Sequence, residues 1–128
     1  AAEQAIAEML NALHEAGIHS FISVLKIFGR QASPGLLSFP REGATLALDL
    51  PNHGEATLRL LSRLDQITLR AGGAVNPYKD SRLPREVFEA SFPALAQMQP
   101  WLDPLAASQF SRRVGFTHHP NSTILAAE

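Results

Sequence analysis

The side chains best suited to chemistry lie in the run Tyr78-Lys79-Asp80-Ser81-Arg82, which follows the glycine pair Gly72-Gly73. Charged groups gathered after a tight turn often form a functional site on a rigid scaffold. Lys26 is a second candidate, because it interrupts the largely apolar stretch 18–28. A lysine ammonium held in a cleft can bind an anionic ligand or stabilise a developing negative charge. Two simpler interpretations stay open: the run is a solvated loop, and Lys26 is an edge residue whose ammonium reaches water.

Several other kinds of site find no support in the sequence. The chain has no cysteine, so disulfides, thiolate nucleophiles and cysteine metal sites are excluded. None of the five histidines stands at ligand spacing with an acidic residue, and we expect no metal site. A phosphate-binding loop needs glycines that lead into a helix, whereas Gly72-Gly73 follows a helical pattern. The net charge of −1 does not favour binding to nucleic acid or to a membrane surface.

Hydrophobic periodicity predicts the elements that must position these lysines. Apolar residues at three- and four-residue spacing indicate helices over residues 1–16 and 55–71. A high content of β-branched and aromatic residues indicates a strand over 18–28, and alternation of leucine with small or polar residues indicates a strand over 44–50. A short strand is expected at Ala74-Val75, after the glycine pair. The order α-β-β-α-β predicts an α+β fold, an antiparallel sheet of few strands with helices packed on one face, followed by C-terminal helices.

The two predicted strands differ in what their faces carry. Both faces of residues 18–28 are largely apolar, so we expect this strand to be central or covered on both sides. In the second strand Leu46 and Leu48 share one face, while Thr45 and Ala47 share the other. Small and polar side chains on that second face leave room for a ligand. Lys79, following the short strand, is predicted to meet Lys26 on the same side of the sheet.

The length of 128 residues suits one compact unit, and the chain divides into three parts. Residues 1–83 form the sheet portion, 84–116 a C-terminal helical segment and 117–128 a polar tail. The low charged fraction of 18% is typical of a domain that buries part of its surface against something else. We find no apolar run long enough to cross a membrane and no signal peptide, which favours a cytoplasmic location. A start at Ala1, without methionine and already helical in pattern, suggests a fragment.

Motifs along the chain together resemble a known family. They are, in order, Ile22-Ser23-Val24-Leu25-Lys26-Ile27-Phe28-Gly29, Leu37-Ser38-Phe39-Pro40, Leu46-Ala47-Leu48-Asp49-Leu50-Pro51, Ala71-Gly72-Gly73, Tyr78-Lys79-Asp80-Ser81-Arg82, Phe88-Glu89-Ala90-Ser91-Phe92-Pro93, Asp103-Pro104 and Ser111-Arg112-Arg113-Val114-Gly115. Their order and spacing resemble the C-terminal part of FAD-linked oxidases of the vanillyl-alcohol-oxidase type. The most similar branch is the one that contains the decaprenylphosphoryl-ribose 2-oxidases. The resemblance covers residues 18–116.

This resemblance implies a role for the chain and for particular residues. The chain corresponds to the end of a substrate (cap) domain plus a segment that returns to an N-terminal FAD-binding domain of the same polypeptide. Lys79 maps onto the lysine beside flavin and substrate, where a cation stabilises negative charge on the reduced flavin. Lys26 maps onto a lysine facing the substrate pocket, which Thr45 and Ala47 also line. The chain alone, without the FAD domain, is expected to be inactive and to self-associate through its uncovered apolar face.

Two departures from the family pattern bear on the substrate and on the domain contact. Asn76-Pro77-Tyr78 stands where the branch has Tyr-x-Ala, so Asn76 and Tyr78 give the pocket a different wall and imply a different substrate, an alcohol or a sugar-like molecule. Gln109 replaces an aspartate in the segment that meets the flavin domain. The alternative hypothesis is a free-standing small α+β module that binds an anionic ligand or a protein partner and performs no catalysis.

Overall fold

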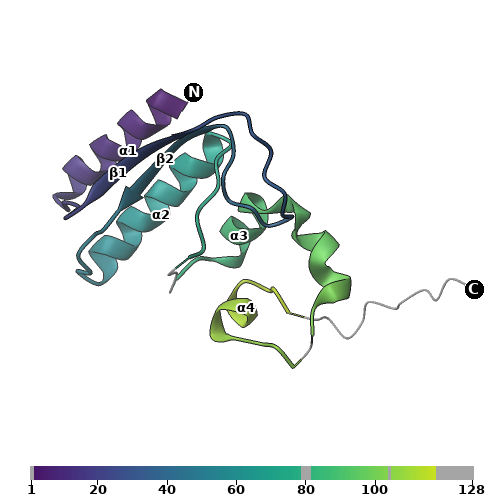
Figure 1. Ribbon diagram of the computed structural model, residues 1–128. Helices are drawn as coiled ribbons and strands as arrows, with labels where there is room; N and C mark the ends of the chain where they lie inside the picture. The colour runs from purple at the N-terminus through teal and green to yellow at the C-terminus, as the bar shows by residue number, and fades with distance from the viewer. Residues whose placement is uncertain (1, 79–81, 104, 118–128) are drawn as a thin grey trace, which may run out of the picture.

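The computed structural model describes residues 2–78, 82–103 and 105–117. Its elements are α1 (Ala2–Ala16), β1 (Ser23–Phe28), β2 (Gly43–Leu48), α2 (Glu55–Arg70), α3 (Arg85–Ser91), the 3₁₀ helix η1 (Pro93–Trp101) and α4 (Gln109–Arg113). The predicted α+β class is confirmed: two antiparallel strands pack against helices, in the order α-β-β-α followed by further helices (Figure 1).

Helices α1 and α2 pack against each other over β2 and form the first hydrophobic core. Their apolar stripes supply buried side chains at helical spacing, among them Leu13 from α1 and Leu60, Leu64 and Ile67 from α2. The first helix ends at Gly17, whose φ of 64° is left-handed and therefore favours glycine. The two exposed ion pairs that join the helices, Glu15–Arg63 and Glu8–Arg70, add little to the burial that holds them together.

The register of the sheet decides which side chains share a face. Lys26 lies directly opposite Thr45, and Val24 lies opposite Ala47. Directly opposite residues of an antiparallel pair point to the same side of the sheet. Leu48, which packs against the first core, belongs to the helix-covered face. Lys26, Thr45 and Ala47 therefore share the face that points away from the helices.

The expectation that the first strand is covered on both sides is wrong. β1 is exposed along nearly its whole length, and Ile27 is 76% exposed. Phe21, just before the strand, is 81% exposed. The reason is the position of β1 in the sheet. α1 contacts β2, and β1 lies at the outer edge of the two-stranded sheet, beyond the area that the helices cover. The chain thus presents an apolar strand to solvent.

The short strand expected at Ala74-Val75 is not formed. The main-chain N–H of Val75 donates to the hydroxyl oxygen of Ser91, at 3.0 Å, and so is not available to a sheet ladder. Ser91 is fully buried in α3, and its carbonyl oxygen accepts a hydrogen bond from Arg41 at 2.8 Å. These contacts attach the segment after α2 to α3 instead of to β2.

A second hydrophobic core lies in the C-terminal part of the chain. Phe88 of α3 is its centre: its ring lies 5.2 Å from the ring of Phe92, 5.5 Å from that of Phe110 and 6.3 Å from that of Phe116. Such tilted and edge-to-face pairs suit the aromatic quadrupole. α3 ends at Ser91, and the 3₁₀ helix η1 begins at Pro93. None of the described helices is long and apolar enough to cross a membrane.

Candidate functional site

The sheet portion carries a groove beside β2, with a volume of about 690 Å³. We call it the β2 groove. Its walls are the N-terminal half of α1, all of β2, the C-terminal half of α2 and the segment that follows α2. Thr45, Ala47, Asn76 and Tyr78, which the sequence placed in a ligand pocket, all line this groove. Residues more than 30 positions apart along the chain are therefore brought to one place.

The two lysines stand differently with respect to this groove. Lys26 does not line it, but projects from the open face of the sheet directly opposite Thr45. Its side chain is exposed, as an ammonium on an edge strand is expected to be. Lys79, the predicted catalytic and cofactor-binding residue, lies outside the described residues, as do Asp80 and Ser81. Their proposed roles stay predictions.

A local turn holds the segment that carries Asn76 and Tyr78. The side-chain oxygen of Asn76 accepts a hydrogen bond from the main-chain N–H of Tyr78 at 3.0 Å, which is the pattern of an Asx turn. The ring of Tyr78 is 80% exposed beside the groove. Together with the hydroxyl of Thr45, the phenol and amide groups give this rim the means to hydrogen-bond a hydroxyl-bearing ligand.

Sequence reasoning missed one feature of the groove wall, the ion pair between Asp65 and Arg82. The guanidinium makes two hydrogen bonds to the carboxylate, one of them from Nη2 to Oδ1 at 2.9 Å. The Asp65 side chain is 4% exposed and that of Arg82 is 23% exposed. Such a bidentate pair is stronger and more directional than a single ionic contact. It fixes Arg82, and hence the end of the run that contains Lys79, to α2.

A signal for this pair was present in the sequence. Leu61, Asp65 and Thr68 follow one another at spacings of four and three, so they share one face of α2, and all line the groove. An aspartate on a helix face that is otherwise apolar or β-branched calls for a cationic partner. The helix pattern does not show which of the eleven Lys and Arg residues pairs with Asp65. Only the tertiary structure identifies this residue as Arg82.

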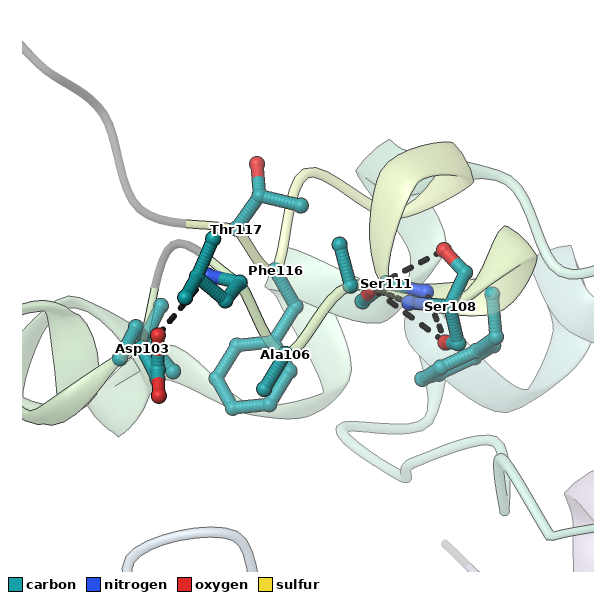
Figure 2. A pocket seen from close by; sticks show the side chains of 10 residues that line it. Asp103, Ala106, Ser108, Ser111, Phe116 and Thr117 are labelled. Carbon is teal, nitrogen blue, oxygen red and sulfur yellow. Dashed lines mark hydrogen bonds between the residues drawn. The ribbon is translucent and has the colours of Figure 1, made fainter.

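A second concavity, of about 550 Å³, lies in the C-terminal part beside α4 (Figure 2). Its polar side chains serve the local backbone. Asp103 accepts the main-chain N–H of Leu105 at 2.8 Å, and Ser108 and Ser111 form a reciprocal capping box at the start of α4. Phe116 and Ala106, which lie near each other, also line it (Figure 2). We assign this cavity to the packing of the C-terminal segment.

No group of three or more His, Asp or Glu side chains within the described ranges is arranged to hold a metal ion. The fold and the groove thus define a class: a small α+β domain with a ligand-sized groove at the edge of an antiparallel sheet.

Comparison with known proteins adds two partial relatives. The chain is 33% identical over 118 residues to an uncharacterized protein of the mprA 5′ region of Streptomyces coelicolor, covering 88% of this chain and 32% of the relative. It is 31% identical over 110 residues to the decaprenylphosphoryl-β-D-ribose oxidase of Mycolicibacterium smegmatis, covering 80% of this chain and 23% of that oxidase. No protein-family model matches the chain.

The similarity to the oxidase supports the motif resemblance at a distant level. The chain is a partial homologue of an oxidase, and it spans less than a third of the length of either relative. The similarity extends over 88% and 80% of the chain, respectively.

Proposed function

We propose that this chain is the C-terminal part of the substrate domain of an FAD-dependent oxidoreductase, which oxidises an alcohol or a sugar-like substrate. The observation that carries the proposal is the groove: residues that the family resemblance assigns to the substrate pocket line one cavity beside β2. The distant homology to an oxidase agrees with this assignment.

In this proposal the open face of the sheet and the rim of the groove form one wall of the substrate pocket. Thr45, Asn76 and Tyr78 supply hydrogen-bonding groups, and Ala47 leaves room for the substrate. Lys26 adds a positive charge opposite Thr45, suited to an anionic or hydroxyl-rich substrate. Asp65 and Arg82 neutralise each other in the groove wall and keep it in shape.

The cofactor belongs to the N-terminal FAD-binding domain of the complete polypeptide. When bound, FAD supplies the acceptor for the hydride that leaves the alcohol carbon. The glycine pair of this chain comes after α2, so it does not form the glycine-rich loop before a helix that would hold the phosphates of FAD. The contribution of this chain is Lys79, whose ammonium would stabilise negative charge on the reduced flavin.

The test of this role uses sulfite, which adds to oxidised flavin and leaves an anionic adduct. In the complete enzyme Lys79→Ala is expected to weaken sulfite binding by about tenfold or more, because a nearby cation stabilises the adduct by roughly 1.4 kcal/mol or more. Flavin absorbance follows the titration. Arg59→Ala is the matched control, since Arg59 is an exposed cation paired with Glu55 on α2 and lies on no wall of the groove. An unchanged sulfite affinity in Lys79→Ala would remove this lysine from the mechanism.

The 128-residue chain by itself is expected to retain no stoichiometric flavin after gel filtration with FAD. The phosphate and adenine sites lie in the other domain in this proposal. Stoichiometric FAD on the purified chain would contradict the assignment of the cofactor to that domain.

The exposed apolar surface around β1 is the proposed contact with the rest of the enzyme, and in the isolated chain it is expected to drive self-association. The surface includes Phe21, Leu25 and Ile27, all more than half exposed. Ile27→Lys is expected to shift the chain toward monomer in sedimentation velocity, because it places a charge in the middle of this surface. Leu58→Lys, on the exposed face of α2, is the control that should leave the distribution unchanged. A chain that is monomeric at high concentration without substitution would refute the idea.

A further inference from the structure

Within residues 2–78, 82–103 and 105–117, β2 pairs only with β1, so its outer edge, at the β2 groove, has no neighbouring strand. The main-chain N–H of Asp49 donates to the carbonyl oxygen of Ile22 at 3.1 Å, so Asp49 points its main-chain groups toward the partner strand. Main-chain groups alternate between the two edges of a strand. Those of Ala44, Leu46 and Leu48 therefore point to the outer edge. In the described parts of the chain, no hydrogen bond is made to these outward N–H and C=O groups.

The lining of the groove shows the same geometry. Consecutive residues of a strand project to opposite faces of the sheet, yet every residue from Gly43 to Leu48 lines the cavity. Only the edge of the strand can present such an unbroken series. The lining also includes a second consecutive run, from Ala71 to Asn76, and α2 contributes Leu64 and Thr68. A strand edge, a second length of backbone and side chains of the helices thus border one space of about 690 Å³.

We propose that the β2 groove is the place of one additional β-strand, which pairs antiparallel with β2 and leads into α1. The start of α1 lies at this groove, since Ala2, Ala5 and Ile6 line it. A strand in the groove, followed by α1 and then β1, makes a crossover connection with β2 between its two strands. α1 lies on the same side of the sheet as α2, as the split β-α-β arrangement requires.

The occupant is a strand of the same protein from outside the 128 residues. The relatives are more than three times as long as the portion that this chain matches, so they contain polypeptide that can supply it. A second copy of the chain fits less well. It would have to bring β2 together with β1 and both helices into a space that residues of α1, α2 and the run from Ala71 to Asn76 also line. A single strand needs only the width between its two neighbours, about 4.8 Å to each.

The chemistry of this strand follows from its surroundings. Side chains that point toward the helices meet Leu64, Met9 and Leu48, so these positions should be apolar. Side chains that point the other way extend the open face that carries Lys26, Thr45 and Ala47. A strand adds at the edge of a sheet, so that face stays open to a substrate. The additional strand would join Thr45 and Asn76 into one continuous wall. The inference rests on the proposed function only for the origin of this strand.

The test is a version of the chain with a designed strand placed before Ala1. The probe is Thr-Val-Thr-Val-Thr-Val-Thr joined through Gly-Ser-Asp, since main-chain hydrogen bonds dominate strand addition and a short tether raises the effective concentration. Amide hydrogen exchange is measured residue by residue by NMR. We expect the amides of Leu46 and Leu48 to exchange about 100-fold more slowly with the extension than without it. The amides of Thr45 and Ala47, which point toward β1, report in both proteins that the β1–β2 ladder is intact.

A matched control replaces the first and third valines of the extension by proline, which cannot donate to a ladder. The proposal is supported if the valine extension slows amide exchange at Leu46 and Leu48 and the proline extension does not. Unchanged exchange of both amides, with Thr45 and Ala47 still protected, overturns the proposal. Protection of Leu46 and Leu48 in the unextended chain that rises with protein concentration also overturns it, in favour of a second copy. The experiment contains no flavin, so its failure and the failure of the oxidoreductase proposal are separate outcomes.

Discussion

Replacing Arg82 by alanine is expected to lower the free energy of unfolding by about 4 kcal/mol. The carboxylate of Asp65 is almost fully buried in the groove wall, and Arg82 contacts both of its oxygens. Without the guanidinium the fold must keep a charged group away from water with no cation to compensate it. The effect is large because Asp65 stands in the middle of α2, a helix of the first core that cannot move without exposing Leu64 and Ile67.

A double-mutant cycle with Asp65→Ala separates the ion pair from any other contact of Arg82. Urea unfolding of the four proteins is expected to give a coupling energy of about 3 kcal/mol, and the double variant should be more stable than the sum of the single changes implies. Arg59→Ala is the control: its ion pair with Glu55 is exposed on both sides and is worth under about 0.5 kcal/mol. A coupling energy near zero would mean that the pair does not fix the loop.

This ion pair also has a consequence for the proposed function. Arg82 is the last residue of the run that holds Lys79, and it is the first described residue after Lys79. The ion pair holds Arg82 in the wall of the groove. If Lys79 acts as proposed, a change at Asp65 is expected to lower activity of the complete enzyme as well as the stability of the domain.

The second large effect is expected in the C-terminal part of the chain. Phe88→Ala should lower the free energy of unfolding by about 4 kcal/mol, since it removes a buried ring and leaves a cavity among three other rings. Those rings belong to Phe92, just after α3, to Phe110 of α4 and to Phe116, which follows α4, so one substitution loosens several elements at once. Loss of their tertiary contacts would be followed by near-ultraviolet circular dichroism during urea unfolding.

Phe21→Ala is the matched control for this prediction. It removes the same ring from a position that is 81% exposed, and the expected loss is under about 0.5 kcal/mol. Equal losses at the two positions would show that the rings around Phe88 do not form a packed core. Such a result would also weaken the assignment of the segment after Pro84 as an ordered part of the domain.

The relation between the sequence and the site is uneven along the chain. Thr45 and Ala47 could be assigned to one sheet face from alternation alone, and the register confirms that they share it with Lys26. Asn76 and Tyr78 entered through a resemblance, and their position on the groove depends on how the chain returns after α2. Asp65 was not identified, because the pairing of a helical aspartate with an arginine 17 positions later is a property of the fold.

By itself the sequence determined the local elements of this protein: the helices α1 and α2, the two strands between them and the α+β class. Hydrophobic periodicity and helix-breaking residues act over a few positions, so they can be recognised in the sequence without knowledge of the fold. Tertiary structure alone decided that β1 lies uncovered, that Val75 bonds to Ser91 instead of a strand, and that the outer edge of β2 faces a groove. Each of these depends on which distant segment occupies a neighbouring position, and hydrophobic pattern does not specify neighbours. The same alternation of apolar residues is compatible with a central strand of a sheet and with an edge strand that has no neighbour on one side.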